Sequence, residues 1–130
     1  MRGKRQFSEK ILAVIRKKKS LRIRAGTGRH RFIRIWAVIV KDRVFVRSWS
    51  IKPDGWYREF LKEPRGAIQV GDRKIAVRAV RIRSRILRDA VDHALLETYR
   101  TPSLFGYAKD MVTPKCRATT IELVPLAQKS

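Results

Sequence analysis

Two apolar runs joined by a short polar turn constrain the fold of this chain more than any other feature. Between Phe32 and Val40, apolar side chains fall on both faces of an extended segment, so both faces should be at least partly buried. Lys41-Asp42 then predicts a two-residue turn, and the alternation continues from Val44 to Ser50. This pattern predicts a hairpin in the wall of a β-barrel.

The same stretch carries residues suited to an anionic, planar ligand. All three tryptophans lie within residues 31–62, and the second run ends in Arg47, Ser48, Trp49 and Ser50. Arginines offer charge-assisted hydrogen bonds, and indoles offer stacking surfaces. A barrel strand whose arginines extend their charged ends into water has the same pattern, and these residues alone do not decide between the two interpretations.

The length of the chain fits a single domain over residues 1–130, with a core at about 7–125. No apolar run approaches the ~18 residues of a membrane span, and the stretch from Ile11 to Ile15 is too short for a secretory signal. We therefore expect a soluble, cytoplasmic protein. Cys116 is the only cysteine and the two histidines show no ligand spacing, so we expect neither a disulfide nor a metal site.

The net charge of the chain is +21, and it is distributed unevenly. Residues 1–88 hold 27 lysines and arginines against 6 acidic residues, while residues 89–130 hold 5 of each. Such a field attracts polyanions, so we expect nonspecific association with nucleic acid at low salt. A basic surface can also serve solubility, and this association would then have no biological role.

Beyond the hairpin, hydrophobic periodicity predicts three helices and four further strands. The helices are expected from a cap at Ser8 to Lys19, over 56–62 and over 85–99. Strands are expected at 21–24, 67–70, 73–83 and 118–124, with a bulge near Ala79 and an irregular segment over 100–114. This order fits a mainly β fold, a small barrel with flanking helices, better than a β-α-β sheet.

Three segments together resemble a known superfamily. They are the glycine turn and hairpin GTGRHRFIRIWAVIVKDRVFVRS, the helix SIKPDGWYREFLKEP and the second hairpin AIQVGDRKIAV. Their layout resembles the FMN-binding split β-barrel superfamily, which includes pyridoxamine-phosphate-oxidase-like proteins, and especially its deazaflavin-dependent nitroreductase branch. With Asp92, Tyr99 and the closing segment TTIELVP, the chain looks most like the bacterial domain-of-unknown-function family 2255.

The resemblance implies a homodimer that binds FMN or a deazaflavin in a groove between two barrels. Residue by residue, it implies that the cofactor phosphate is held by Arg29, Arg34, Arg47, Ser48 and Ser50. It also implies a ring pocket lined by Trp36, Trp49, Trp56 and Tyr57. The chemistry would be hydride or electron transfer supplied by the cofactor, and no catalytic side chain or substrate is indicated.

Departures from the pattern keep other functions open. His30-Arg31 stands where the deazaflavin branch typically has a serine-glycine, and Trp36 or Trp49 could fill the pocket. The resemblance implies a flavin- or deazaflavin-dependent oxidoreductase, and the residues themselves do not decide whether the protein is an enzyme. The alternatives are a non-catalytic barrel without a cofactor and a protein that binds polyanions or nucleic acid through its basic surface.

Overall fold

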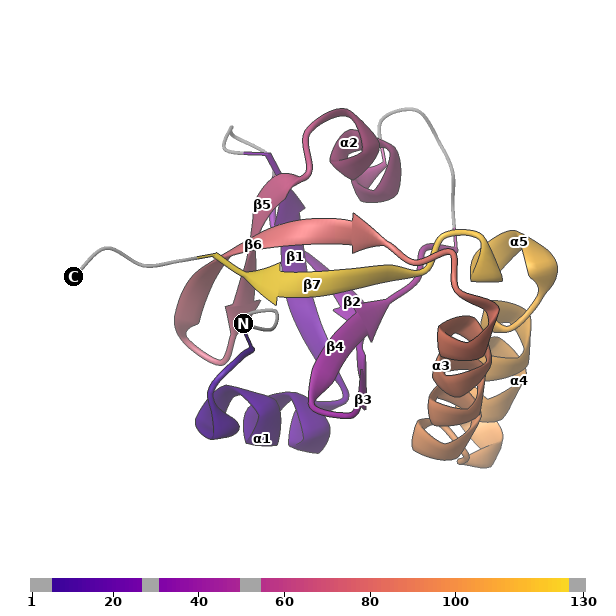
Figure 1. The fold of residues 1–130 in the computed structure, drawn as a ribbon. Helices are drawn as coiled ribbons and strands as arrows, with labels where there is room; N and C mark the ends of the chain where they lie inside the picture. The colour runs from indigo at the N-terminus through magenta and orange to yellow at the C-terminus, as the bar shows by residue number, and fades with distance from the viewer. Residues whose placement is uncertain (1–5, 27–30, 50–54, 127–130) are drawn as a thin grey trace.

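The computed structural model describes residues 6–26, 31–49 and 55–126. Within these ranges the chain forms seven strands and five helices (Figure 1). The strands are β1 Ser20–Ala25, β2 Ile33–Trp36, β3 Val38–Val40, β4 Arg43–Val46, β5 Arg65–Val70, β6 Arg73–Arg81 and β7 Ile121–Pro125. The helices are α1 Glu9–Lys18, α2 Trp56–Lys62, α3 Arg85–Thr98, α4 Pro102–Met111 and α5 Pro114–Arg117. None of the described helices has the length and apolar character needed to cross a membrane.

The strands form one antiparallel sheet in the order β2-β1-β5-β6-β7-β4-β3. Its two edge strands, β2 and β3, follow one another along the chain and are separated only by Ala37. The two edges are therefore adjacent, and the sheet curls into a nearly closed barrel. We expected one extended segment over residues 32–40, but Ala37 divides it, because its first half pairs with β1 and its second half with β4.

Both faces of the barrel wall are buried at β3 and β4, as the sequence predicts, whereas Ile33 and Arg34 of β2 are exposed. Inside the barrel, one apolar cluster includes Ile23 and Ile68, which face each other across β1 and β5. Outside it, a second cluster includes Phe45, Val91 and Tyr99. Full burial of one such side chain stabilises a fold by about 1.5–3 kcal/mol. Helices α3 to α5 lie together on one side of the barrel (Figure 1), so the chain itself covers part of the apolar outer surface of the barrel.

The N-terminal helix forms as its sequence predicts. The backbone N–H of Ile11 donates to Ser8 Oγ at 3.3 Å, and Lys19 ends α1 with a φ of 59°. Basic residues 16–18 occupy the last turn, where the helix dipole favours positive charge. The buried side of α1, which includes Ile15, packs onto the barrel.

A tight turn sets the register of each hairpin. Lys41 and Asp42 both have positive φ values, 52° and 62°, as a two-residue hairpin turn requires. This confirms the turn predicted between β3 and β4. In the turn between β5 and β6, Gly71 takes the left-handed conformation with a φ of 62°.

The predicted bulge near Ala79 is wrong. Strand β6 pairs in unbroken register with β5 from Arg73 to Arg78 and with β7 from Val77 to Arg81. The apolar side chains change from one face of the sheet to the other near the end of β6 for another reason. Ile82, just beyond the strand end, belongs to the outer apolar cluster rather than to the barrel interior.

The segment expected to be irregular forms helices α4 and α5 instead. Pro102 and Pro114 stand at the start of these helices, where the missing N–H of proline has no partner to lose. These prolines therefore begin helices rather than interrupt them. The last strand starts at Ile121, later than predicted, because α5 and its exit turn occupy the preceding residues. The helices predicted over 56–62 and 85–99 are confirmed as α2 and α3.

Candidate functional site

Six of the nine predicted site residues line one cavity of about 450 Å³. The cavity lies between β2, the residues that follow β4, the start of α2 and helix α4. The six are Arg34, Trp36, Arg47, Ser48, Trp49 and Trp56. The rest of the lining is Ile35, Gly55, Leu104, Tyr107 and Met111. The fold thus brings most of the predicted residues together.

The other three predicted residues do not belong to this lining. Tyr57 is buried in the barrel core, and its hydroxyl donates to the carbonyl of Ala118 at 3.4 Å. This position supports a packing role for Tyr57 rather than contact with a ligand. Arg29 and Ser50 lie outside the described residues.

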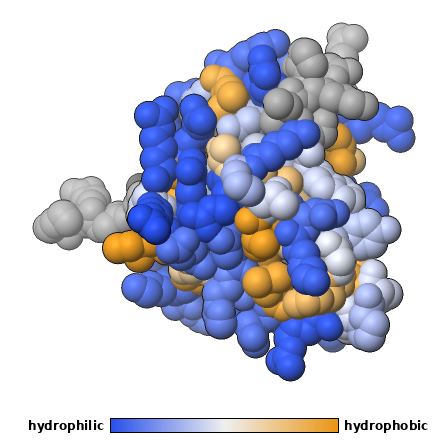
Figure 2. All heavy atoms as spheres, turned by 90° about the vertical axis from the view of Figure 1, so that its right-hand side faces the viewer, coloured by the Kyte–Doolittle hydropathy of each residue, from blue (hydrophilic) through white to orange (hydrophobic). Residues whose placement is uncertain are grey.

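Aromatic pairs shape the walls of the cavity. Trp36 stacks on Tyr99 with ring centroids 3.8 Å apart and 12° between the ring planes. Trp49 meets Tyr107 edge-on at 5.3 Å, and their side chains are 53% and 51% exposed. Trp36 is thus fixed by the ring that covers one of its faces, whereas Trp49 and Tyr107 form an open rim. On the side of α3 and α4, several apolar groups gather in the lower centre of the face and are surrounded by hydrophilic ones (Figure 2).

Arg34 is the exposed cation of the cavity. It lies on β2, directly opposite Arg22 of β1. Among the described residues, no carboxylate forms an ion pair with Arg34. Its guanidinium is therefore available to an anion that enters from solvent.

Arg47 is placed differently, because its side chain is fully buried. Its guanidinium donates to two side chains, from Nε to Thr120 Oγ1 at 2.8 Å and from Nη1 to Asp92 Oδ1 at 2.5 Å. It also donates to two backbone carbonyls, from Nη1 to that of Met111 at 2.9 Å and from Nη2 to that of Arg88 at 3.0 Å. Burial lowers the pKa of Arg47, and the hydrogen bond to Asp92 opposes this effect. The chain itself thus uses donors that we expected a phosphate to engage.

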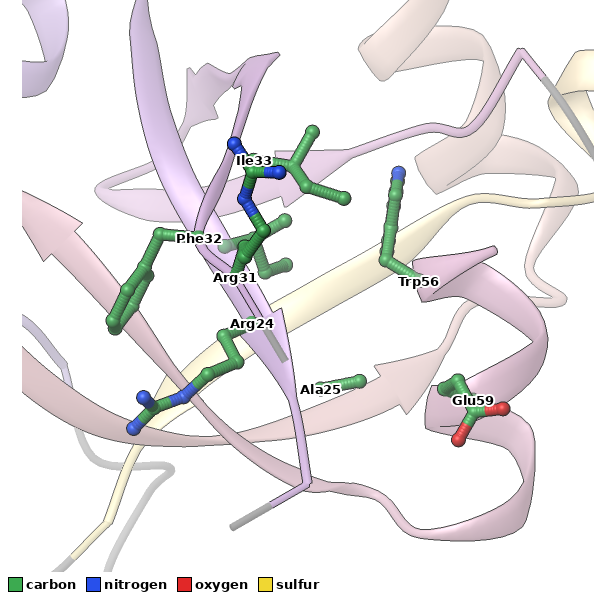
Figure 3. A pocket seen from close by; sticks show the side chains of 8 residues that line it. Arg24, Ala25, Arg31, Phe32, Ile33, Trp56 and Glu59 are labelled. Atoms are coloured by element: carbon green, nitrogen blue, oxygen red, sulfur yellow. The ribbon is translucent and has the colours of Figure 1, made fainter. Parts of the chain in front are cut away.

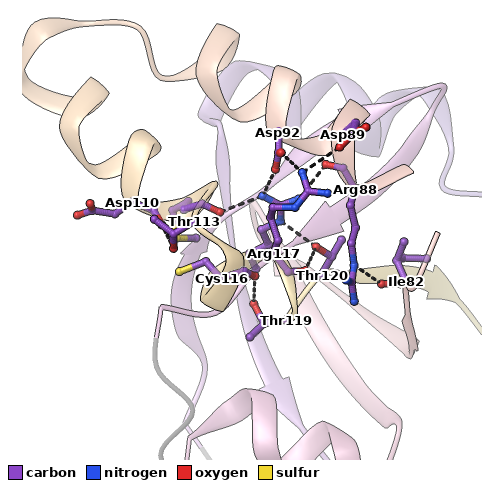
Figure 4. A network of polar contacts seen from close by, with 12 residues as sticks. Ile82, Arg88, Asp89, Asp92, Asp110, Thr113, Cys116, Arg117, Thr119 and Thr120 are labelled. Atoms are coloured by element: carbon purple, nitrogen blue, oxygen red, sulfur yellow. Dashed lines mark hydrogen bonds and ion pairs between the residues drawn. The ribbon is translucent and has the colours of Figure 1, made fainter. Parts of the chain in front are cut away.

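A second arginine completes the polar network around Asp92 (Figure 4). Arg117 of α5 forms ion pairs with Asp92 and, at 3.0 Å, with Asp89 of α3. The hydrogen bond to Asp89, followed by that to Asp92, raises the pKa of Arg117. The network ties α3, α5 and the residues after β4 together beside the cavity.

A threonine anchors the chain at Ser48. The Ser48 N–H donates to Thr119 Oγ1 at 2.9 Å. The same hydroxyl lies 2.6 Å from the carbonyl oxygen of Cys116 and 3.2 Å from that of Ser48, and its single proton can go to only one of them at a time. Thr119 therefore fixes the backbone of Ser48 at the cavity wall.

Residues 11–123 match the family described as uncharacterized proteins conserved in bacteria, DUF2255. The chain belongs to this family. Among solved structures, the DUF2255 protein is similar to a conserved hypothetical protein from Mycobacterium tuberculosis, with a TM-score of 0.56 and 13% identity. The match covers 99% of this chain and 86% of the other, and at this identity it shows the fold alone. No curated protein matches the sequence.

Sequence reasoning missed the contribution of α4 to the cavity of this DUF2255 protein. Leu104, Tyr107 and Met111 belong to the lining, and they recur at intervals of three and four residues. Such spacing is typical of one face of a helix. This spacing, together with Pro102 as the first helical residue, is the sequence pattern that indicates α4.

A second hollow, of about 410 Å³, shares Trp56 with the first cavity. Residues from α2, β1 and β2 line it, among them Glu59, Ala25 and Ile33 (Figure 3). Glu59 brings a carboxylate to its wall. Arg24 and Arg31 belong to the same lining, so this hollow carries charges of both signs.

Proposed function

We propose that this DUF2255 protein binds FMN or a deazaflavin in the tryptophan-lined cavity and functions as an oxidoreductase. The observation that supports this most is that six residues chosen from the sequence converge on one cavity. Its volume of about 450 Å³ falls within the range of roughly 300–1,000 Å³ that small-molecule sites occupy.

The lining fits both halves of such a cofactor. The indoles of Trp36, Trp49 and Trp56 offer apolar and stacking surface to a planar ring. Arg34 is an exposed cation that pairs with no carboxylate of the described chain, and Ser48 lies in the same lining, so this part of the wall suits a phosphate. The bound cofactor would supply hydride or electron transfer, while these side chains bind and orient it.

Within this proposal, Arg47 acts by positioning the cavity wall. Its buried guanidinium is held by Asp92, Thr120 and two backbone carbonyls. Ser48 and Trp49 follow it directly in the chain, so the network fixes where they stand. Arg29 and Ser50 stay predicted phosphate ligands outside the described residues.

Titration of the purified protein with FMN and with riboflavin, followed by flavin fluorescence, tests the proposal. Riboflavin carries the same ring without the phosphate. If Arg34 holds the phosphate, FMN should bind about 10- to 100-fold more tightly than riboflavin, the scale of a hydrogen bond between charged groups. A deazaflavin titrated in the same way decides between the two cofactor classes.

Arg34→Ala and Arg83→Ala provide matched variants, because each removes one exposed positive charge. Arg34→Ala should abolish the preference for FMN over riboflavin, and Arg83→Ala should keep it. Equal losses in both variants would indicate diffuse attraction and reject the phosphate site. Failure of the wild-type protein to bind FMN, riboflavin or the deazaflavin would reject the function and favour a barrel without a cofactor.

We also propose that a second copy of the chain covers the open rim of this cavity. Trp49 and Tyr107 are about half exposed there, and the split barrels that the sequence resembles bind their cofactors between two protomers. Light scattering at micromolar concentration and moderate salt should then report a dimer. A monomer under these conditions would remove this part of the proposal.

A further inference from the structure

A row of polar side chains crosses the outer face of the sheet. The strand register places Arg34, Arg22, Gln69 and Lys74 opposite one another on β2, β1, β5 and β6. Ile23, the next residue along β1, belongs to the barrel core, so its neighbour Arg22 and the rest of the row face outwards. Adjacent strands lie about 4.8 Å apart, and the row therefore spans roughly 14 Å.

Part of this row lies in a hollow of about 430 Å³ that is lined by cations and neutral residues. Its lining is Lys18, Ser20, Leu21, Arg22, Arg34, Gln69 and Gly71. Within the described ranges, none of its three cations forms an ion pair. The acidic residue next to this lining in sequence is Asp72, which is exposed in the β5–β6 turn. The hollow therefore favours an anion over a cation.

An aromatic ring stands beside the row. The guanidinium carbon of Arg24 lies 4.5 Å from the centroid of the Phe32 ring, and Lys74 Nζ lies 5.6 Å from it. Figure 3 shows Arg24 and Phe32 on the same side of β1, away from Trp56. The Nε of Arg24 has no hydrogen-bond partner among the described residues.

We propose that this outer face binds single-stranded nucleic acid. Arg22, Lys18 and Lys74 contact the phosphates, and Phe32 contacts a base. Proteins that bind single strands combine a basic surface that follows the backbone with an aromatic ring on which bases stack, and this face has both parts. The net charge of +21 brings the strand to the protein, and the row determines where it binds.

The shape of the face favours a single strand over a duplex. The face is built from β2, β1, β5 and β6, whereas helices α3 to α5 lie together beside the other part of the barrel (Figure 1). A duplex is usually read by a helix or a two-stranded ribbon that enters a groove. The outer wall of a barrel instead offers a curved surface to exposed bases, as other small barrels do.

Fluorescence anisotropy with a labelled oligothymidylate of about 12 nucleotides tests the proposal. Affinity is measured between about 50 and 200 mM salt for the wild-type protein and for the double variant Arg22→Gln/Lys74→Gln. Each lost phosphate contact should lower the slope of log affinity against log salt by about 0.7, so the double variant should lose about 1.4. The matched control Arg58→Gln/Arg83→Gln removes two exposed charges elsewhere and should keep the slope.

Phe32→Leu tests the base contact separately from charge. Loss of stacking on one base should weaken binding of the oligonucleotide about 5- to 100-fold and leave heparin binding unchanged. Circular dichroism confirms that each variant is folded before it is measured. All these variants should bind FMN like the wild-type protein, because none of the substituted residues lines the tryptophan cavity.

Two results would overturn this inference. Equal changes of salt slope in the two double variants would show that attraction is spread over the whole surface. Equal affinity for the oligonucleotide, duplex DNA and heparin at the same salt, together with no effect of Phe32→Leu, would show that the face does not recognise single strands. Either result leaves the flavin proposal standing, since Arg34 is unchanged in every variant.

Discussion

The arginines of the polar network and those of the outer sheet face have opposite surroundings. Arg47 and Arg117 are held by Asp92, and Arg47 also donates to two backbone carbonyls. Arg22 and Arg34 face each other across β1 and β2 and pair with no carboxylate of the described chain. Where the chain supplies the acceptors, an arginine holds the fold together. Where it places two exposed cations opposite each other, water or a bound anion supplies the acceptors.

The arginines of the two regions also differ in how much they contribute to the stability of the fold. A buried charge that loses its partner keeps its desolvation penalty, so the network arginines are costly to remove. Like charges directly opposite each other on neighbouring strands repel, so the face arginines contribute little to stability or oppose it. The comparison therefore predicts which substitutions change folding and which change binding.

The largest effect should follow removal of Arg47. Arg47→Ala leaves Thr120 Oγ1 and two backbone carbonyls without this donor and removes one of the two arginines that hold Asp92, so the free energy of unfolding should fall by about 3–5 kcal/mol. Urea denaturation followed by circular dichroism measures it. A loss below about 1 kcal/mol would break the comparison, because Arg47 would then behave like an exposed arginine.

The next effect concerns Tyr99, a buried polar group held by the backbone. Its hydroxyl lies within hydrogen-bond distance of the Lys19 and Ala37 carbonyl oxygens, and burial raises its pKa above the ordinary value of 10.0. The folded protein therefore keeps a proton that the unfolded chain releases as the pH rises past 10. Stability from this group is complete below pH 10 and should fall above it by up to about 1.4 kcal/mol per pH unit.

Tyr99→Phe is the control for this alkaline loss, because it removes the titrating group while keeping the ring that stacks on Trp36. Urea denaturation at several pH values between about 9 and 11 should give a shallower decline for the variant than for the wild-type protein. Parallel declines would assign the alkaline loss to other groups and leave Tyr99 without this role.

The smallest effect on stability should come from Arg22→Gln. This substitution removes one of two like charges at a cross-strand pair, so the free energy of unfolding should change by no more than about 0.5 kcal/mol, or rise slightly. The same urea experiment measures it. A loss above about 1 kcal/mol would mean that Arg22 belongs with the structural arginines.

Local chemistry explains which parts of the fold could be predicted from the sequence. Ser8 caps α1, Lys41-Asp42 forms the β3–β4 turn and Trp56 begins α2, because each depends on a few neighbouring residues. The division of residues 32–40 at Ala37 could not be read in this way. The division depends on strand pairing: the first half of the segment pairs with β1 at one edge of the sheet, and the second half pairs with β4 at the other edge.

The same limit applies to the candidate site. Clustered tryptophans and arginines indicated six residues of the cavity lining, since side chains near a hairpin end stay close together. The role of Arg47 depends on Asp92, Met111 and Thr120, which are 45 to 73 residues away in the sequence. No local pattern distinguishes Arg47 from Arg34, and only the fold shows that one is enclosed and the other exposed.

The most direct test of the distinction between the ligand-binding Arg34 and the structural Arg47 is the FMN affinity of Arg34→Ala. The free energy of unfolding of this variant is measured on the same preparation. The account predicts that FMN binding weakens about 10- to 100-fold while riboflavin binding and stability stay at the wild-type level. An Arg34→Ala variant that binds FMN as tightly as the wild-type protein would contradict it. So would a variant that loses stability to the extent expected of Arg47→Ala.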